Sequence, residues 1–233
     1  RVAQDAAKIF VPAEGEQLPD HLPALRGLLH FAVLQQDFAT LADTAEALAI
    51  ALHDTDERYL HYMLAGVVSQ ELLKDVARAR RAYMAGLRLS PTRDEAFERL
   101  RVSYGVLPQS KENATALAEL ISERLGREGE SAAQKSVLRL ELAQLLVGPL
   151  GDRARARKEL EAAIAETPDQ PAVLYMLGKM LADDREWVRA AELLERYCKS
   201  EQRPSQLVAL HVLLADMYSD HLQDPQQAIA HYT

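Results

Sequence analysis

The sequence lacks the residues that disulfide-bonded, thiolate-zinc and sheet-rich proteins need. Cys198 is the one cysteine in 233 residues, which excludes an internal disulfide and a zinc site built from several thiolates. Aromatic residues make up only 6% of the chain and there are 10 glycines, whereas alanine and leucine are frequent. This balance favours helices packed through small and aliphatic side chains over sheets of β-branched and aromatic residues.

Clustered positive charge and long apolar runs are also missing. Lys and Arg total 27 against 35 Asp and Glu, giving a net charge of −8 with the signs interspersed. Nucleic-acid binding depends on clustered cations that displace counterions from phosphates, so a nucleic-acid partner is disfavoured. No run of about 18 apolar residues is present, so we expect no membrane span. Arginine outnumbers lysine 20 to 7, which points by codon usage to a bacterium but leaves cytoplasm and periplasm equally open.

Helical periodicity is the main signal in the chain. From Leu22 onward, apolar residues recur at steps of three and four, which is the period of an α-helix. Short polar breaks interrupt the pattern, and each supplies a helix-ending residue or an Asp that caps the next helix. Four of them are Gln36-Asp37, Lys74-Asp75, Gly151-Asp152 and Gln223-Asp224-Pro225. The pattern predicts an all-α chain of about a dozen helices, joined by short connections that make neighbours antiparallel.

The predicted helix pairs begin at a regular step. Their boundaries lie near residues 20, 56, 92, 130, 169 and 204, and a step in the mid-thirties indicates a helical repeat array. We predict pairs at residues 20–55, 56–91, 92–129, 130–168, 169–203 and 204–233, preceded by the end of an earlier helix and a linker at residues 1–19. Because the first residue is Arg and the last, Thr233, falls inside a predicted helix, we expect a fragment of a longer protein.

The stretch from Pro171 to Pro204 resembles a tetratricopeptide repeat. The matching residues are Leu174, Leu177, Gly178 and Leu181 in the first helix, Trp187 after the turn, and Ala190, Leu194 and Tyr197 in the second helix. Two further helices resemble the second half of the motif, through Asp75, Ala79, Tyr83, Gly86 and Pro91, and through Asp152, Ala156, Leu160, Ala163 and Pro168. In this family, small residues at the positions of Gly178 and Ala190 let two helices approach closely. The resemblance implies a right-handed α-α superhelix of about six antiparallel helix pairs.

Motifs for catalysis or metal binding do not accompany the repeats. The sequence contains no nucleophile elbow, phosphate-binding glycine loop or His-Glu-x-x-His helix. Neither His53 with His61 nor His211 with His221 has the spacing that places two imidazoles on one helical face. Cys198 lies at an apolar-face position and is expected to be a packed thiol. We therefore predict no enzyme activity, no cofactor and no metal site.

The resemblance implies that a partner binds in the concave groove, which first-helix residues line. Carried over from the best repeat and its neighbour, these positions are Tyr175, Met176, Lys179, Asp183, Val212, Asp216 and Ser219. Some members of the family hold a C-terminal carboxylate with Lys, Asn and Arg at these places, and only Lys179 of that set is present here. We therefore exclude such a clamp and expect the groove to take an extended or helical protein segment.

Three functions fit these observations. A protein-binding scaffold or adaptor agrees with the repeats and with the missing catalytic motifs. The chain would alternatively be the regulatory or substrate-recruiting arm of a larger enzyme or transcription regulator. An RNA-binding helical repeat shares the architecture but is disfavoured by the acidic balance. Self-association through the end repeats is a further partner hypothesis.

Overall fold

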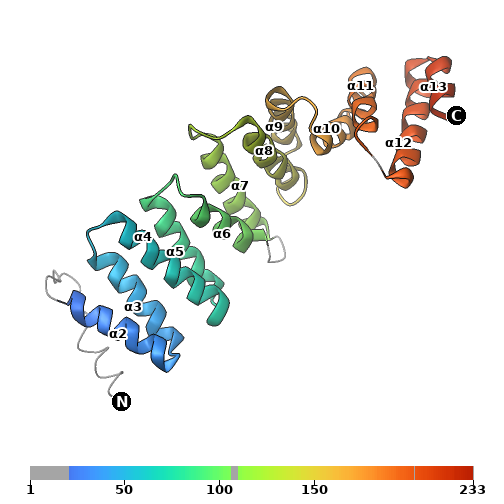
Figure 1. Ribbon diagram of the computed structural model, residues 1–233. Helices are drawn as coiled ribbons and strands as arrows, with labels where there is room; N and C mark the ends of the chain where they lie inside the picture. The colour runs from blue at the N-terminus through green and yellow to red at the C-terminus, as the bar shows by residue number, and fades with distance from the viewer. Residues whose placement is uncertain (1–20, 106–109, 202, 233) are drawn as a thin grey trace. The chain divides into compact units, whose positions relative to one another are not determined.

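A computed structural model describes residues 21–105, 110–201, 203–232, and these form twelve α-helices and two π-helical turns with no strand among them. In chain order the elements are α2 (Leu22–Gln35), α3 (Phe38–Ala51), α4 (Thr55–Val67), η1 (Val68–Leu72), α5 (Val76–Leu89), α6 (Asp94–Gly105), α7 (Lys111–Leu125), α8 (Ala132–Val147), α9 (Arg153–Glu166), α10 (Pro171–Asp183), α11 (Trp187–Cys198), α12 (Pro204–Met217), η2 (Tyr218–Leu222) and α13 (Pro225–Tyr232) (Figure 1). The predicted all-α fold is confirmed. The expected end of a preceding helix at residues 1–19 lies outside the described residues.

The helices belong to two compact units, Arg1–Pro108 and Gln109–Thr233. In the first unit, each helix from α2 to α5 packs against the next one along the chain. The second unit continues in the same way from α7 to α13. The pair expected at residues 92–129 therefore has α6 in the first unit and α7 in the second.

The turn between the two helices of a hairpin is built in the same way five times. A residue in the left-handed region is followed by an acidic residue that starts the next helix. The left-handed residues are Gln36 (φ 54°), Lys74 (57°), Gly151 (70°), Arg185 (64°) and Gln223 (55°). In four of the turns an Asp then accepts a hydrogen bond from the backbone N–H three residues later; the pairs are Asp37 with Thr40, Asp75 with Arg78, Asp152 with Arg155 and Asp224 with Gln227. These bonds satisfy N–H groups that a helix start leaves unpaired, and they confirm the predicted breaks.

The hairpin of α10 and α11 packs as the repeat resemblance implies. Its motif residues Leu174, Leu177, Leu181, Ala190 and Leu194 are each at most 1% exposed. A Cβ atom on Gly178 would lie 2.8 Å from Cδ2 of Leu194, so the close approach of the two helices requires glycine there. Trp187 is half-buried and stacks on His221, with ring centroids 3.8 Å apart.

The first unit has a reciprocal contact between two tyrosines and two glycines. Tyr83 on α5 packs on Gly66 of α4, whose added Cβ would lie 2.9 Å from Cζ of that ring. Tyr59 on α4 packs on Gly86 of α5, where a Cβ would be 3.7 Å from the ring. Both tyrosine side chains are almost completely buried. This exchange allows α4 and α5 to approach each other closely.

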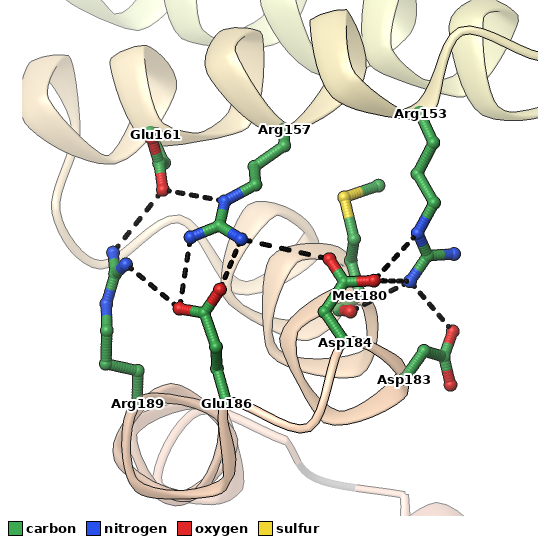
Figure 2. Close-up of polar contacts among 8 residues, drawn as sticks. All are labelled: Arg153, Arg157, Glu161, Met180, Asp183, Asp184, Glu186 and Arg189. Atoms are coloured by element: carbon green, nitrogen blue, oxygen red, sulfur yellow. Dashed lines mark hydrogen bonds and ion pairs between the residues drawn. The ribbon is translucent and has the colours of Figure 1, made fainter.

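Arginine side chains connect consecutive hairpins in the second unit. Figure 2 shows Arg157 of α9 between Glu161 on its own helix and Glu186 in the turn before α11. Its Nε lies 3.2 Å from Glu161 Oε1, and its Nη2 lies 3.0 Å from Glu186 Oε2. A planar guanidinium donates in several fixed directions at once, so arginine suits this bridging position better than lysine.

Candidate functional site

A groove of about 970 Å³ lies in the second unit. Its walls come mainly from α8, α10 and α12, which are the first helices of three consecutive hairpins. The C-terminal end of α11 and the residues after it also line the groove, through Tyr197, Ser200, Glu201 and Arg203. The groove therefore runs across the repeats, on the side that the first helices share.

The structure brings together the four predicted groove residues of α10. Tyr175, Met176, Lys179 and Asp183 all line the groove, because steps of three and four keep them on one helical face. Tyr175 is 40% exposed, whereas Leu174 beside it is buried in the hairpin core. Helix α10 thus has one face in the core and one in the groove.

The structure does not place the three predicted residues after α10 in this groove. On α12 the lining residues are Gln206, Ala209, Leu210 and Leu213. Val212, Asp216 and Ser219 lie on the neighbouring ridge of the helix and its π-helical extension. Asp216 accepts a hydrogen bond of 2.5 Å from the Tyr232 hydroxyl, so it faces α13, its own hairpin partner. The rotation of α12 about its axis therefore differs from the one expected.

Two tyrosines form the aromatic part of the groove. The rings of Tyr175 and Tyr197 are 5.1 Å apart between centroids and tilted by 44°. Lys179 Nζ lies 5.7 Å from the centroid of the Tyr175 ring, within range of a cation–π contact. The Tyr197 hydroxyl donates a hydrogen bond to Glu201, and this bond raises the pKa of Tyr197. The raised pKa keeps the phenol of Tyr197 neutral at pH 7.

Most charges in the groove are paired. Arg153 Nη2 lies 3.2 Å from Asp183 Oδ2 and donates to the Met180 carbonyl oxygen at 2.8 Å (Figure 2). Arg203 Nη2 lies 2.7 Å from Oε2 of Glu201, whose side chain is only 6% exposed. The contacts among the described residues give Lys179 no ion pair. The ammonium group of Lys179 is thus a positive charge without an ion-pair partner among the described residues, in a groove lined by apolar and aromatic side chains.

Reactive groups are scarce around the groove. Cys198 is half-buried, and burial raises the pKa of its thiol, which keeps it protonated and poorly nucleophilic. In the ranges that the structure describes, no group of three or more His, Cys, Asp or Glu side chains is arranged to hold a metal ion. Among the helices described, none has both the length and the apolar character to cross a membrane. The groove is lined by a few aromatic, apolar and charged side chains.

The chain has a tetratricopeptide-like helical repeat fold. Part of a tetratricopeptide repeat-containing protein from Cytophaga hutchinsonii is similar in structure, with a TM-score of 0.57, 13% identity, and coverage of 99% of this chain and 86% of that one. PilF from Pseudomonas aeruginosa is similar with a TM-score of 0.52 and 15% identity, covering 99% of this chain and 90% of PilF. MamA is similar with a TM-score of 0.50 and 17% identity, covering 72% of this chain and 90% of MamA. No protein-family model and no curated protein matches the sequence.

Proposed function

We propose that this chain is a protein-binding scaffold that holds a segment of a partner protein in the groove of its second unit. The observation that carries the proposal is the groove itself: a surface lined by three first helices, with an exposed tyrosine on the middle one, α10. Exposed aromatic side chains in a concave setting are typical anchors of protein interfaces. The tetratricopeptide-like fold supports the same function.

The charge pattern favours one class of partner segment. Apolar and aromatic residues of the groove, chiefly Tyr175, Met176 and Leu213, suit aliphatic or aromatic side chains of the partner. Arg153 and Arg203 are already neutralised by acidic neighbours, so Lys179 is the cation left for an incoming carboxylate. The partner we propose is therefore a short segment with apolar anchors and an Asp or Glu that pairs with Lys179.

Selection from a displayed library of random peptides, followed by calorimetry on purified peptides, tests the proposal. The selected sequences should combine apolar residues with Asp or Glu. Lys179→Glu should weaken their binding by roughly tenfold, which is about 1.4 kcal/mol, because it places like charges together. Tyr175→Ala should weaken it further, since truncating a central aromatic anchor costs about 2 kcal/mol or more.

Lys158→Glu is the matched control. Lys158 is an exposed lysine on α9 outside the groove, and the substitution makes the same change of charge. Its peptide affinity should equal that of the unmodified chain. Peptides that bind the Lys179→Glu and Tyr175→Ala variants as tightly as the unmodified chain would overturn the proposal, and so would a selection that yields no binding peptide.

A further inference from the structure

The last hairpin brings two histidines into direct contact. Nδ1 of His211 on α12 and Nδ1 of His231 on α13 are 2.8 Å apart, and the ring centroids are separated by 5.1 Å. The spacing of His211 and His221 in the sequence does not favour that pair, and in the structure His221 stacks on Trp187. The antiparallel path of the hairpin places His231 opposite His211, although the two are 20 residues apart.

A carboxylate lies beside the other nitrogen of one of these rings. Nε2 of His231 is 3.7 Å from Oε1 of Glu195 on α11. Tyr218 donates its hydroxyl hydrogen to the same carboxylate, and its ring stacks on His231 with an interplanar angle of 9°. The His231 side chain is only 12% exposed. The ring is therefore oriented from both sides, with Nε2 toward Glu195 and Nδ1 toward His211.

This arrangement resembles a metal-binding histidine with its supporting carboxylate, although the 3.7 Å between Nε2 of His231 and Oε1 of Glu195 would have to shorten for a hydrogen bond to form. In metal sites, a ligating imidazole commonly donates its second N–H to a carboxylate, which fixes the tautomer and raises the basicity of the ligating nitrogen. Two imidazole nitrogens held at about 2.0 to 2.1 Å from a tetrahedral ion are about 3.3 Å apart. The two Nδ1 atoms now face each other at hydrogen-bond distance. To hold one ion they would have to separate by about half an ångström, and both rings would have to turn so that their lone pairs meet at the ion.

We propose that His211 and His231 chelate a divalent transition-metal ion through their Nδ1 atoms, with Glu195 as the supporting carboxylate. Imidazole ligands suit Zn²⁺, Ni²⁺ and Cu²⁺ and exclude Mg²⁺ and Ca²⁺, which prefer oxygen. Because no third protein ligand is grouped with the pair in the described residues, water completes the coordination.

The ion would fasten the terminal helix. Helix α13 has eight residues, of which only Ala228 is buried, so apolar packing holds it weakly. A bond from His231 through the ion to His211 would link α13 to α12, which forms one wall of the groove. An ion that binds the folded state alone stabilises that state according to its concentration relative to its dissociation constant.

Calorimetric titration of the full chain, without a histidine tag, with Zn²⁺ tests the site. One ion should bind per chain, raise the midpoint of thermal unfolding relative to the same sample with EDTA, and slow amide exchange in α13. Either His211→Asn or His231→Asn should weaken this binding by at least tenfold. Asparagine keeps a polar atom near the position of Nδ1, and the two variants guard against a folding defect in one of them.

Two further variants separate the site from scattered surface binding. His53→Asn removes an exposed histidine of the first unit and should leave Zn²⁺ affinity unchanged. Glu195→Gln keeps both ligands and should weaken affinity by about 10- to 100-fold, the usual effect of losing a supporting carboxylate. Failure of the unmodified chain to bind Zn²⁺ at millimolar concentration would overturn the proposal. Equal affinity of the unmodified chain and His211→Asn would overturn it as well.

Discussion

The guanidinium of Arg157 and the carboxylate of Glu186 form a two-pronged ion pair that joins α9 to the turn before α11 (Figure 2). Glu186 is also the N-cap residue directly before α11, and Arg189 of that helix lies 3.5 Å from the same carboxylate. The hydrogen bond from Arg157 lowers the pKa of Glu186 below its ordinary value of 4.5. The pair therefore makes the stability of the second unit depend on pH.

The sign of this dependence follows from the lowered pKa of Glu186. A carboxyl whose pKa is lower in the folded state adds stability above its unfolded pKa and loses it as the pH falls through the folded value. Glu186→Gln should therefore lower the free energy of unfolding at pH 7, and the difference from the unmodified chain should shrink as the pH falls below 4.5. Urea unfolding followed by fluorescence of Trp187, the one tryptophan, measures this in the second unit.

Glu192→Gln provides the control for the pH experiment. Glu192 is exposed on α11, and the described contacts give it no ion pair. This variant should differ little from the unmodified chain at any pH. A Glu186→Gln deficit that stays constant or grows in acid would contradict the assigned role of the pair.

Gly66 should be intolerant of any side chain. A Cβ atom there would lie 2.5 Å from Cδ1 of Tyr83, whose fully buried ring has no room to move away. Gly66→Ala should lower the free energy of unfolding of the first unit by about 1 to 3 kcal/mol, as overpacking of a core does. Gly27 on α2 has nothing within 4 Å of its Cβ position. Gly27→Ala should instead stabilise the unit by roughly 0.5 to 1 kcal/mol. The midpoint of thermal unfolding, followed by far-UV circular dichroism, should therefore fall for Gly66→Ala and rise for Gly27→Ala.

The left-handed residues at the hairpin turns predict a second pair of opposite effects. Gln36 has φ 54° and ψ 31°, a conformation that costs a residue with a Cβ about 1 to 2 kcal/mol. Gln36→Gly should raise the free energy of unfolding by up to about 1 kcal/mol, because glycine adopts this conformation without strain. The gain is smaller than the relieved strain, since glycine also increases the entropy of the unfolded chain. Gln35→Gly, one residue earlier in the helix, should lower stability instead. Equal effects of the two substitutions would show that the backbone conformation is not what matters at position 36.

Features set by neighbours along the chain could be predicted from the sequence. The hairpin breaks depend on a cap and the N–H group three residues later, as at Asp37 and Asp152, so the local sequence is sufficient. The groove face of α10 follows from helical spacing around Gly178, whose contact with Leu194 fixes which side turns inward. Both predictions require only the period of one helix and the contact between the two helices of one hairpin.

Features set by contacts between helices far apart in sequence could not be predicted in the same way. The rotation of α12 depends on how it packs, and the bond between Asp216 and Tyr232 turns the expected groove residue toward α13. The contact of His211 with His231 depends on the same packing. Sequence spacing alone does not determine how two helices rotate against each other, because several ridges of a helix have similar spacing.

Two fully buried serines provide the final prediction. Ser136 on α8 donates to the Ala163 carbonyl oxygen at 3.3 Å and contacts the side-chain oxygen of Gln170, which connects three helix ends. Ser69 in the π-helical turn η1 is equally buried, but its hydroxyl has no hydrogen-bond partner among the described residues. Removal of the hydroxyl therefore deletes hydrogen bonds at Ser136, whereas at Ser69 it removes a buried polar group that has no partner among the described residues.

Ser136→Ala should lower the free energy of unfolding of the second unit by about 1 kcal/mol, because it removes the hydrogen bonding of a buried hydroxyl. Ser69→Ala should leave the stability of the first unit unchanged or raise it, since burying an unpaired hydroxyl is unfavourable. Both substitutions make the same chemical change inside a helical segment, so differences in helix propensity largely cancel. Urea unfolding read by Trp187 fluorescence for Ser136, and amide exchange of α4 and α5 for Ser69, report on each unit separately. Destabilisation by Ser69→Ala as large as that by Ser136→Ala would mean that its hydroxyl is hydrogen-bonded in solution.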